Sequence, residues 1–330
     1  MQQTKRSRHQ HMTSFQVISL GFLSVILLGS LLLMLPIATK SGQCTSFLDA
    51  LFTSTSAVCV TGLVINDTAT YWSLFGQGII LLLIQIGGMG IITIAIAIAV
   101  VSGRKIGLMQ RSTMQEAISA PTVGGIVRRT QFIIRTTILI EIIGAALLAP
   151  VFCRDFGFWK GIWYSLFHSI SAFCNAGFDL IGIRTPFSSL TSYSVQPIVN
   201  LVIMALIVAG GIGFLTWEDI KIHKWHFKKY KMQSKVIFMV TGLLIFLPAL
   251  YFFCFEFSNV PLTERVWVSL FQSVTPRTAG FNTANLTLLS EVGQMLIIIL
   301  MLIGGSPGST AGGMKTTTLA VLVSSALSVF

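Results

Sequence analysis

The sequence predicts an all-α polytopic membrane protein built like a potassium channel. Parallel repeats are expected to surround a central pore, each with a transmembrane helix, a re-entrant pore helix, a filter loop and a second transmembrane helix. The first observation is composition: the 330 residues are 53% hydrophobic and only 10% charged, whereas soluble domains carry about a quarter charged residues. The second is that long uncharged stretches alternate with shorter apolar ones. The third is that this order occurs three times.

Six nearly uncharged stretches are predicted to cross the membrane, because a helix needs about 20 apolar residues to span the hydrocarbon core. They lie within residues 9–39, 68–103, 136–153, 185–217, 236–255 and 292–314. Only the third contains an acid, Glu141, which is a functional candidate by default. Its partner is left open between Arg135 and a hydrogen-bonding group within the bundle.

Three shorter apolar segments lie between paired spans, at residues 46–54, 158–169 and 262–273. Each is too short to cross a bilayer and too apolar for a solvated loop, so we expect re-entrant helices. A glycine-ended loop follows each of them. Each following span then carries a glycine pair, at Gly87-Gly88, Gly210-Gly211 and Gly304-Gly305. These pairs are expected to let helices approach closely.

Basic residues set the orientation, because they cluster in residues 5–8, 104–135 and 221–235. Lys and Arg in short loops beside membrane spans stay in the cytoplasm, which places the N-terminus inside. The glycine-ended loops then all enter from outside. We attribute the net charge of +11 first to the cytoplasmic loops that set the topology and second to attraction to anionic membrane lipid. No nucleic-acid partner is expected.

The expected organisation follows from these boundaries. It comprises a cytoplasmic N-terminus (1–13), a first helix–pore loop–helix repeat (14–103), a cytoplasmic basic loop (104–130), a second repeat (131–220), a second cytoplasmic basic loop (221–234) and a third repeat with a broken second helix (235–330).

The glycine-ended loops are the candidate ion-binding site. Non-helical backbone inside a membrane is tolerated only where it is buried in protein or lines a cavity. Around an axis, its carbonyl oxygens can replace the hydration shell of a cation, and a terminal glycine permits the required dihedrals. Almost no acid is present, which suits a monovalent cation. The candidates are Val58, Cys59, Val60, Thr61 and Gly62; Phe173, Cys174, Asn175, Ala176 and Gly177; and Arg277, Thr278, Ala279 and Gly280.

Several side chains in these loops carry separate expectations. Arg277 would repel cations if it faced the pore, so its side chain is expected to point away and brace the loop. Asn175 and Asp179 are candidates for tuning the outer mouth. A disulfide between Cys59 and Cys174 is disfavoured, since both are better interpreted as small residues that contribute carbonyls. For one loop alone, an ordinary helix C-cap would be the preferred interpretation.

Residues 304–315, here called the broken segment, interrupt the last span. Pro307 and the glycines break a helix, which would place a flexible polar segment in the conduction path below the loops. The alternative is a tolerated kink with close packing. The candidate gate residues are Gly304, Gly305, Ser306, Pro307, Gly308, Ser309, Thr310, Ala311, Gly312, Gly313 and Lys315.

The three units, the loops 58–62, 173–177 and 276–280, and the run 304–315 resemble the Trk/Ktr/HKT potassium transporters. The chain is most similar to the membrane, ion-translocating subunit of bacterial Ktr systems, because its first unit begins almost at once. The resemblance implies K⁺ as the transported ion, held at filter carbonyls, with Na⁺ as a modulator and no covalent cofactor. It also implies that the broken segment is the gate.

Partners and location follow from the same resemblance. It implies a homodimer, a cytoplasmic nucleotide-binding regulatory subunit of the RCK/KTN type, and the plasma (inner) membrane of a bacterium. The family has four units around one pore. Three occur in this sequence, so the fourth repeat is expected to be missing from a partial chain.

Three alternatives remain open. The first is a secondary cation transporter with alternating access, since some of these have parallel repeats; re-entrant helices and carbonyl loops favour a channel-like pore instead. The second is a membrane scaffold without ion flux. The third is an intramembrane serine hydrolase, because residues 304–308 match G-x-S-x-G. That motif requires a preceding strand and a catalytic base, so we expect no enzymatic activity.

Overall fold

The computed structural model describes residues 13–91, 93–94, 115–116 and 125–329. Within this part of the chain the regular structure is helical, with only two isolated β-bridges, which confirms the all-α prediction. The cytoplasmic segment expected over 1–13 and most of the basic loop expected over 104–130 lie outside the described residues. The α-helices are α1 (Ser14–Leu33), α2 (Phe47–Val58), α3 (Leu74–Met89), α6 (Ile126–Phe156), α7 (Phe158–Phe173), α8 (Pro197–Gly211), α9 (Phe214–His223), α10 (Met232–Tyr251), α11 (Leu262–Val274), α12 (Glu291–Leu302) and α13 (Thr316–Val329).

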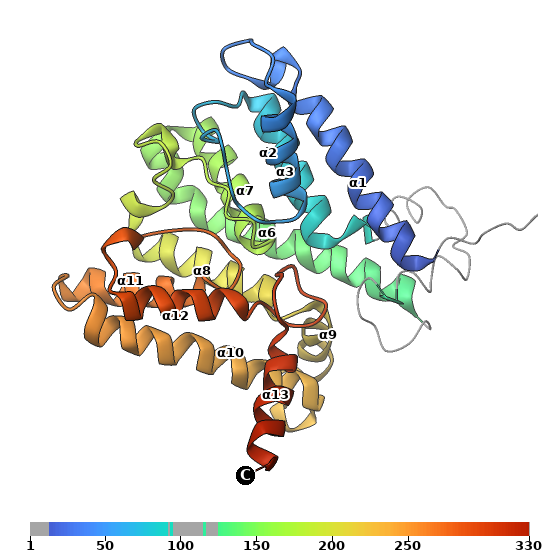
Figure 1. Ribbon diagram of the computed structural model, residues 1–330, viewed down its shortest axis with the longest axis vertical. Coiled ribbons are helices and arrows are strands. Elements are labelled where there is room, and N and C mark those ends of the chain that lie inside the picture. Colours follow the sequence, from blue (N-terminus) through green and yellow to red (C-terminus); the bar gives the residue numbers. More distant parts are fainter. Residues whose placement is uncertain (1–12, 92, 95–114, 117–124, 330) are drawn as a thin grey trace, which may run out of the picture.

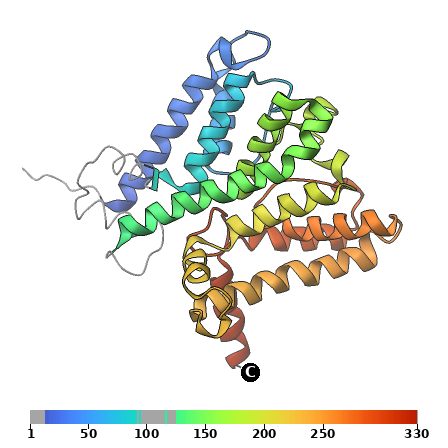
Figure 2. The same ribbon diagram turned by 180° about the vertical axis from the view of Figure 1, so that it is seen from behind.

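Three units of similar construction follow one another along the chain (Figure 1). The first comprises α1, α2 and α3; the second α6, α7 and α8, continued by α9; the third α10, α11 and α12, continued by α13. Helix α3 contacts α7, and α8 contacts α11. The second unit therefore contacts both of the others, and Figure 2 shows the three units from behind.

The short helices begin where apolar segments were predicted. Helix α2 starts one residue after Ser46, whose hydroxyl accepts a hydrogen bond from the Asp49 backbone N–H at 3.2 Å as an N-cap. Helices α7 and α11 start at the predicted Phe158 and Leu262. Each ends at, or within two residues of, its glycine-ended loop, so the negative end of each helix points toward that loop.

The longest helices meet the requirements for crossing a membrane. Helices α1, α6 and α10 are long and apolar enough, and α8 with α9 forms a fourth candidate bent by 97°. Helix α6 has 31 residues, about 46 Å at 1.5 Å per residue, against a hydrocarbon core of about 30 Å. Its first turns extend beyond the core and take up residues 126–130, which had been assigned to a basic loop.

The other predicted spans are not long uninterrupted helices. Helix α3 has 16 residues and α12 has 12. Helix α12 ends at Leu302, where the glycine-rich broken segment begins, and α13 turns away from it (Figures 1 and 2). Six stretches therefore have the hydropathy of a span, but inside three of them a helix ends at glycines: at Gly90, at Gly211 and after Leu302. Hydropathy alone does not report where a helix bends.

The core lies where the three units meet. Its largest buried side chains include Phe152, Phe167, Phe173, Phe178, Phe271 and Phe281, which come mainly from α7, α11 and the glycine-ended loops. Large apolar side chains on α1, α6 and α10 are exposed instead, for example Leu31, Leu139 and Phe246. Exposed apolar faces on long helices are typical of contact with lipid, and a buried loop backbone is what a membrane interior permits.

Candidate functional site

The glycine-ended loops converge at their glycines. A methyl group on Gly62 would lie 2.5 Å from the carbonyl oxygen of Ala176, and one on Gly177 would lie 2.7 Å from that of Ala279. A methyl group on Gly280 would lie 3.2 Å from the Cα of Gly177. Backbone packs directly on backbone, so no residue with a side chain fits at Gly62 or Gly177 without displacement.

The same backbone conformation recurs in all three loops. The terminal glycines have φ of +80°, +73° and +80°, at Gly62, Gly177 and Gly280. Two residues earlier in each loop, a non-glycine residue is also left-handed, with φ of +56°, +57° and +66° at Val60, Asn175 and Thr278. β-Branched residues avoid this region, and holding one there costs about 1–3 kcal/mol. The three loops therefore share a left-handed residue at equivalent positions, and in two of them that residue is β-branched.

Hydrogen bonds from the helix ends fix the loops. The Thr61 and Ala176 N–H groups donate to carbonyls five residues earlier, those of Ser56 and Ser171, both at 2.8 Å. In the third loop the Ala279 N–H donates to the carbonyl four residues earlier, at 3.0 Å. This difference agrees with a run-up that is one residue shorter in sequence.

The glycine pairs bring the second helix of a unit against its own loop. A methyl group on Gly87 would collide with the carbonyl oxygen of Val58, and one on Gly210 with that of Phe173. Val58 and Phe173 occupy equivalent positions in the first and second loops. The pairs therefore permit close approach, as expected, but the contact is between a helix and loop backbone. In the third unit, Gly304 packs on the Gly312 carbonyl instead.

The broken segment folds back on itself and docks on the bend between α8 and α9. The Gly304 N–H donates to the Met314 carbonyl at 3.0 Å, and the Gly305 N–H to the Gly312 carbonyl at 3.2 Å. Three further backbone bonds attach it to the bend: Ser306 N–H to the Gly211 carbonyl at 2.8 Å, Thr310 N–H to the Gly210 carbonyl at 3.3 Å, and Phe214 N–H to the Gly308 carbonyl at 2.8 Å. The Lys315 ammonium donates to the Ala311 carbonyl at 2.8 Å.

The broken segment also contacts the second loop. Asn175 Nδ2 donates to Thr310 Oγ1 at 2.9 Å, and Thr310 Oγ1 donates to the Phe173 carbonyl at 2.9 Å. The expectation that Asn175 tunes the outer mouth is therefore wrong for its side chain. The left-handed backbone at Asn175 turns the amide toward the broken segment.

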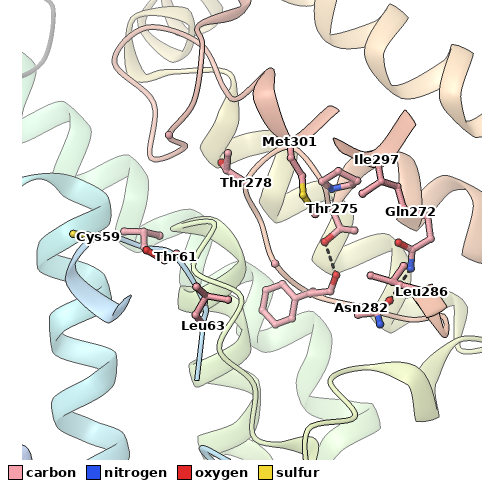
Figure 3. Close-up of a pocket in the computed structure, with 16 residues that line it drawn as sticks. Cys59, Thr61, Leu63, Gln272, Thr275, Thr278, Asn282, Leu286, Ile297 and Met301 are labelled. Carbon is pink, nitrogen blue, oxygen red and sulfur yellow. Dashed lines mark hydrogen bonds between the residues drawn. The ribbon is translucent and has the colours of Figure 1, made fainter. Parts of the chain in front are cut away.

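A cavity of about 520 Å³ lies between the first and third loops. Figure 3 shows Cys59, Thr61 and Leu63 on one side, with Thr275, Thr278 and Met301 opposite. Among the residues that the structure describes, no charged side chain lines it. Its walls are loop backbone, hydroxyl groups and apolar side chains, and backbone and hydroxyl oxygens are ligands that suit a monovalent cation.

Arg277 does not line this cavity, although it belongs to the third loop. Its side chain is 5% exposed, and Nη2 donates to Thr241 Oγ1 of α10 at 3.5 Å. The guanidinium therefore lies between the loop and α10, which is the orientation expected from its charge. Cys59 and Cys174 are both free thiols.

Glu141 makes its side-chain contact within the bundle. Gln85 Nε2 of α3 donates to Glu141 Oε2 at 3.2 Å, and no ion pair with Glu141 occurs among the described residues. This settles the open choice in favour of a hydrogen-bonding group. Gln85 also accepts a long contact from Cys174 Sγ at 3.8 Å. Gln85 was not among the residues singled out from the sequence, although an amide deep in an apolar stretch is a usable signal.

Together these features define a helical membrane protein whose parallel units present re-entrant loops at a common centre, with a broken helix beneath one of them. The family model described as TrkH, cation transport protein, matches residues 1–330. The chain belongs to this family of cation transport proteins. The assignment confirms the resemblance found in the sequence and the expectation that the protein is not an enzyme.

Similar proteins agree with this assignment. The potassium/sodium uptake protein NtpJ of Enterococcus hirae is 42% identical over 324 residues, covering 97% of this chain and 70% of that protein. The Ktr system potassium uptake protein B of Bacillus subtilis is 40% identical over 333 residues, covering 99% of this chain and 73% of that protein.

A solved structure supports the fold. The crystal structure of the potassium transporter TrkH from Vibrio parahaemolyticus superposes with a TM-score of 0.69 at 22% identity, over 97% of this chain. This chain spans 63% of the length of that structure.

Proposed function

We propose that this chain is the membrane subunit of a potassium uptake system, in which loop carbonyls bind K⁺ during its passage. The convergence of three loops with the same left-handed backbone, at Gly62, Gly177 and Gly280, carries this proposal. Backbone carbonyls select monovalent cations without a ring of acids. Relatives named for potassium or potassium/sodium uptake support K⁺ as the transported ion. A modulating role of Na⁺ is part of the same proposal.

The broken segment is proposed as the gate. It docks on the bend between α8 and α9 through backbone hydrogen bonds, and it contacts the second loop directly. Helix α9 continues toward the basic residues 224–231, which the orientation rule places in the cytoplasm. A regulatory subunit that binds there, of the nucleotide-binding type, would act on the broken segment through α9. The backbone hydrogen bonds between the broken segment and the bend would provide a short mechanical path from α9 to that segment.

Assembly is proposed on the same basis. The cavity between the first and third loops is the position that a fourth glycine-ended loop would take, which would close the ring of carbonyls. Two such membrane subunits are proposed to form a dimer in the plasma membrane of a bacterium, with the N-terminus in the cytoplasm.

The test is growth of a bacterium without its own potassium uptake systems at low external K⁺. Expression of the full-length protein is expected to restore growth, and Gly177→Ala is expected to abolish it, because the new methyl group meets the Ala279 carbonyl at a positive φ. Gly78→Ala is the matched control, since nothing lies within 4 Å of its methyl position. Equal growth with both variants would contradict the filter assignment.

A further inference from the structure

The Thr310 hydroxyl makes two hydrogen bonds to the second loop across a large separation in sequence. It accepts from Asn175 Nδ2 at 2.9 Å and donates to the Phe173 carbonyl at 2.9 Å. Thr310 is 7% exposed and Asn175 is 1% exposed. One hydroxyl therefore binds both the backbone and a side chain of the loop, with its donor and one acceptor in use.

The surroundings of these bonds are closely packed. A methyl group on Gly210 would collide with the Phe173 carbonyl and would lie 2.7 Å from Thr310 Oγ1. The Thr310 backbone N–H is itself bonded to the Gly210 carbonyl at 3.3 Å. If the hydroxyl is removed, the buried Asn175 amide loses its partner, and an unmade hydrogen bond of a buried group is costly.

The other two loops lack this connection. Val60, equivalent to Asn175, has no polar side chain, and the buried Thr278 hydroxyl has no hydrogen-bond partner within the described part of the chain. Among the described residues, the second loop is thus the one whose left-handed residue is bonded through its side chain to the broken segment. The asymmetry singles out the second loop.

We infer that Thr310 is a positioning residue for ion selection. Its hydroxyl fixes the second loop while the broken segment is docked, so that movement of the segment also releases the Phe173 carbonyl and the Asn175 side chain. This inference rests on the proposed function of the loops as a filter and of the segment as a gate. Docking of the broken segment then affects the preference between K⁺ and Na⁺ as well as the amount of cation that passes.

A holding role alone makes a different prediction. If Thr310 only keeps the segment in place, its loss changes the rate of K⁺ uptake and leaves the preference for K⁺ over Na⁺ as it was. If Thr310 positions the loop, the preference changes as well. The ratio of K⁺ to Na⁺ uptake therefore separates the two roles, and it does not depend on how much protein is present.

The experiment measures that ratio for the full-length protein, purified and reconstituted into liposomes. Thr310→Val keeps the shape and removes both bonds, and we expect the ratio to fall about fivefold or more. Thr310→Ser keeps the hydroxyl and is expected to stay within about twofold of the unmodified protein. Thr287→Val is the control, because Thr287 is exposed and its hydroxyl donates to the nearby Asn285 side chain, far from the loops in sequence.

A second variant removes the same hydrogen bond at its other end, in the second loop. Asn175→Leu is expected to lower the ratio, and combining it with Thr310→Val should add little, because residues that share one bond act non-additively. It also provides the test if Thr310→Val fails to fold. An unchanged ratio in the folded variants, beside normal K⁺ uptake by the unmodified protein, would overturn this inference alone. Absence of uptake by the unmodified protein would instead overturn the proposed function.

Discussion

Gln85 and Glu141 join the first and second units inside the membrane through one hydrogen bond of 3.2 Å. Glu141 is 4% exposed, and its second carboxyl oxygen, Oε1, is buried and has no partner among the residues described. A buried acid with one amide partner is sensitive to loss of that partner, because an unpaired polar group in an apolar interior costs more than a made bond contributes. The pair lies directly behind the second loop, since Gln85 also contacts Cys174.

Removing one partner of this pair is therefore expected to be worse than removing both. Gln85→Leu should lower the free energy of unfolding by about 1–3 kcal/mol. The double variant Gln85→Leu, Glu141→Leu should recover most of that loss, because an apolar replacement of both partners leaves nothing unsatisfied. Thermal unfolding of the purified protein in detergent measures both. A double variant less stable than Gln85→Leu would contradict the pairing.

The two glycines of the second pair should respond differently to alanine. A methyl group on Gly210 collides with the Phe173 carbonyl, whereas one on Gly211 has nothing within 4 Å. We expect Gly210→Ala to destabilise the protein by about 1–3 kcal/mol through overpacking and to reduce K⁺ uptake. Gly211→Ala, one residue along the same helix, is the matched control and should change stability by less than about 1 kcal/mol. K⁺ uptake and the free energy of unfolding would be measured for both variants.

Docking of the broken segment can be tested at Gly213, which ends the bend between α8 and α9. This residue has φ of +88°, and a methyl group on it would lie 2.6 Å from the Pro307 carbonyl. Gly213→Ala is expected to push the segment away from the bend and raise K⁺ flux through reconstituted protein without a regulatory subunit. Gly242→Ala in α10, where nothing lies within 4 Å, should leave flux unchanged. Equal or reduced flux in Gly213→Ala would contradict the gate assignment.

Local sequence features predicted the elements well. The short apolar segments that begin at Ser46, Phe158 and Leu262 placed the short helices, because burial of an apolar face is decided over a few residues. Glycine at the end of each loop predicted the left-handed backbone there. The left-handed conformation of Val60 and Thr278 was not predictable, because it opposes the local preference of β-branched residues and is imposed by the surrounding fold.

Contacts between distant segments could not be predicted. The bond between Asn175 and Thr310 joins residues 135 positions apart, and a single sequence gives no signal for such a pair. The bend after Gly211 was not predictable, because the apolar stretch continues through it and hydropathy does not report the direction of a helix axis. Gln85 and Glu141 are intermediate: each is unusual in its own span, but only the packing of α3 beside the second unit pairs them.

The assignment of the loops as the filter is tested by serine at two glycines with similar backbone and different surroundings. Gly62 and Gly42 have φ of +80° and +70°; a methyl group would meet the Ala176 carbonyl at Gly62, and nothing within 4 Å at Gly42. The measurement is the ratio of K⁺ to Na⁺ uptake by reconstituted protein. If the loops are the filter, Gly62→Ser lowers the ratio by about tenfold, equivalent to 1.4 kcal/mol of discrimination, and Gly42→Ser leaves it unchanged. An unaltered ratio and rate in folded Gly62→Ser would contradict the account.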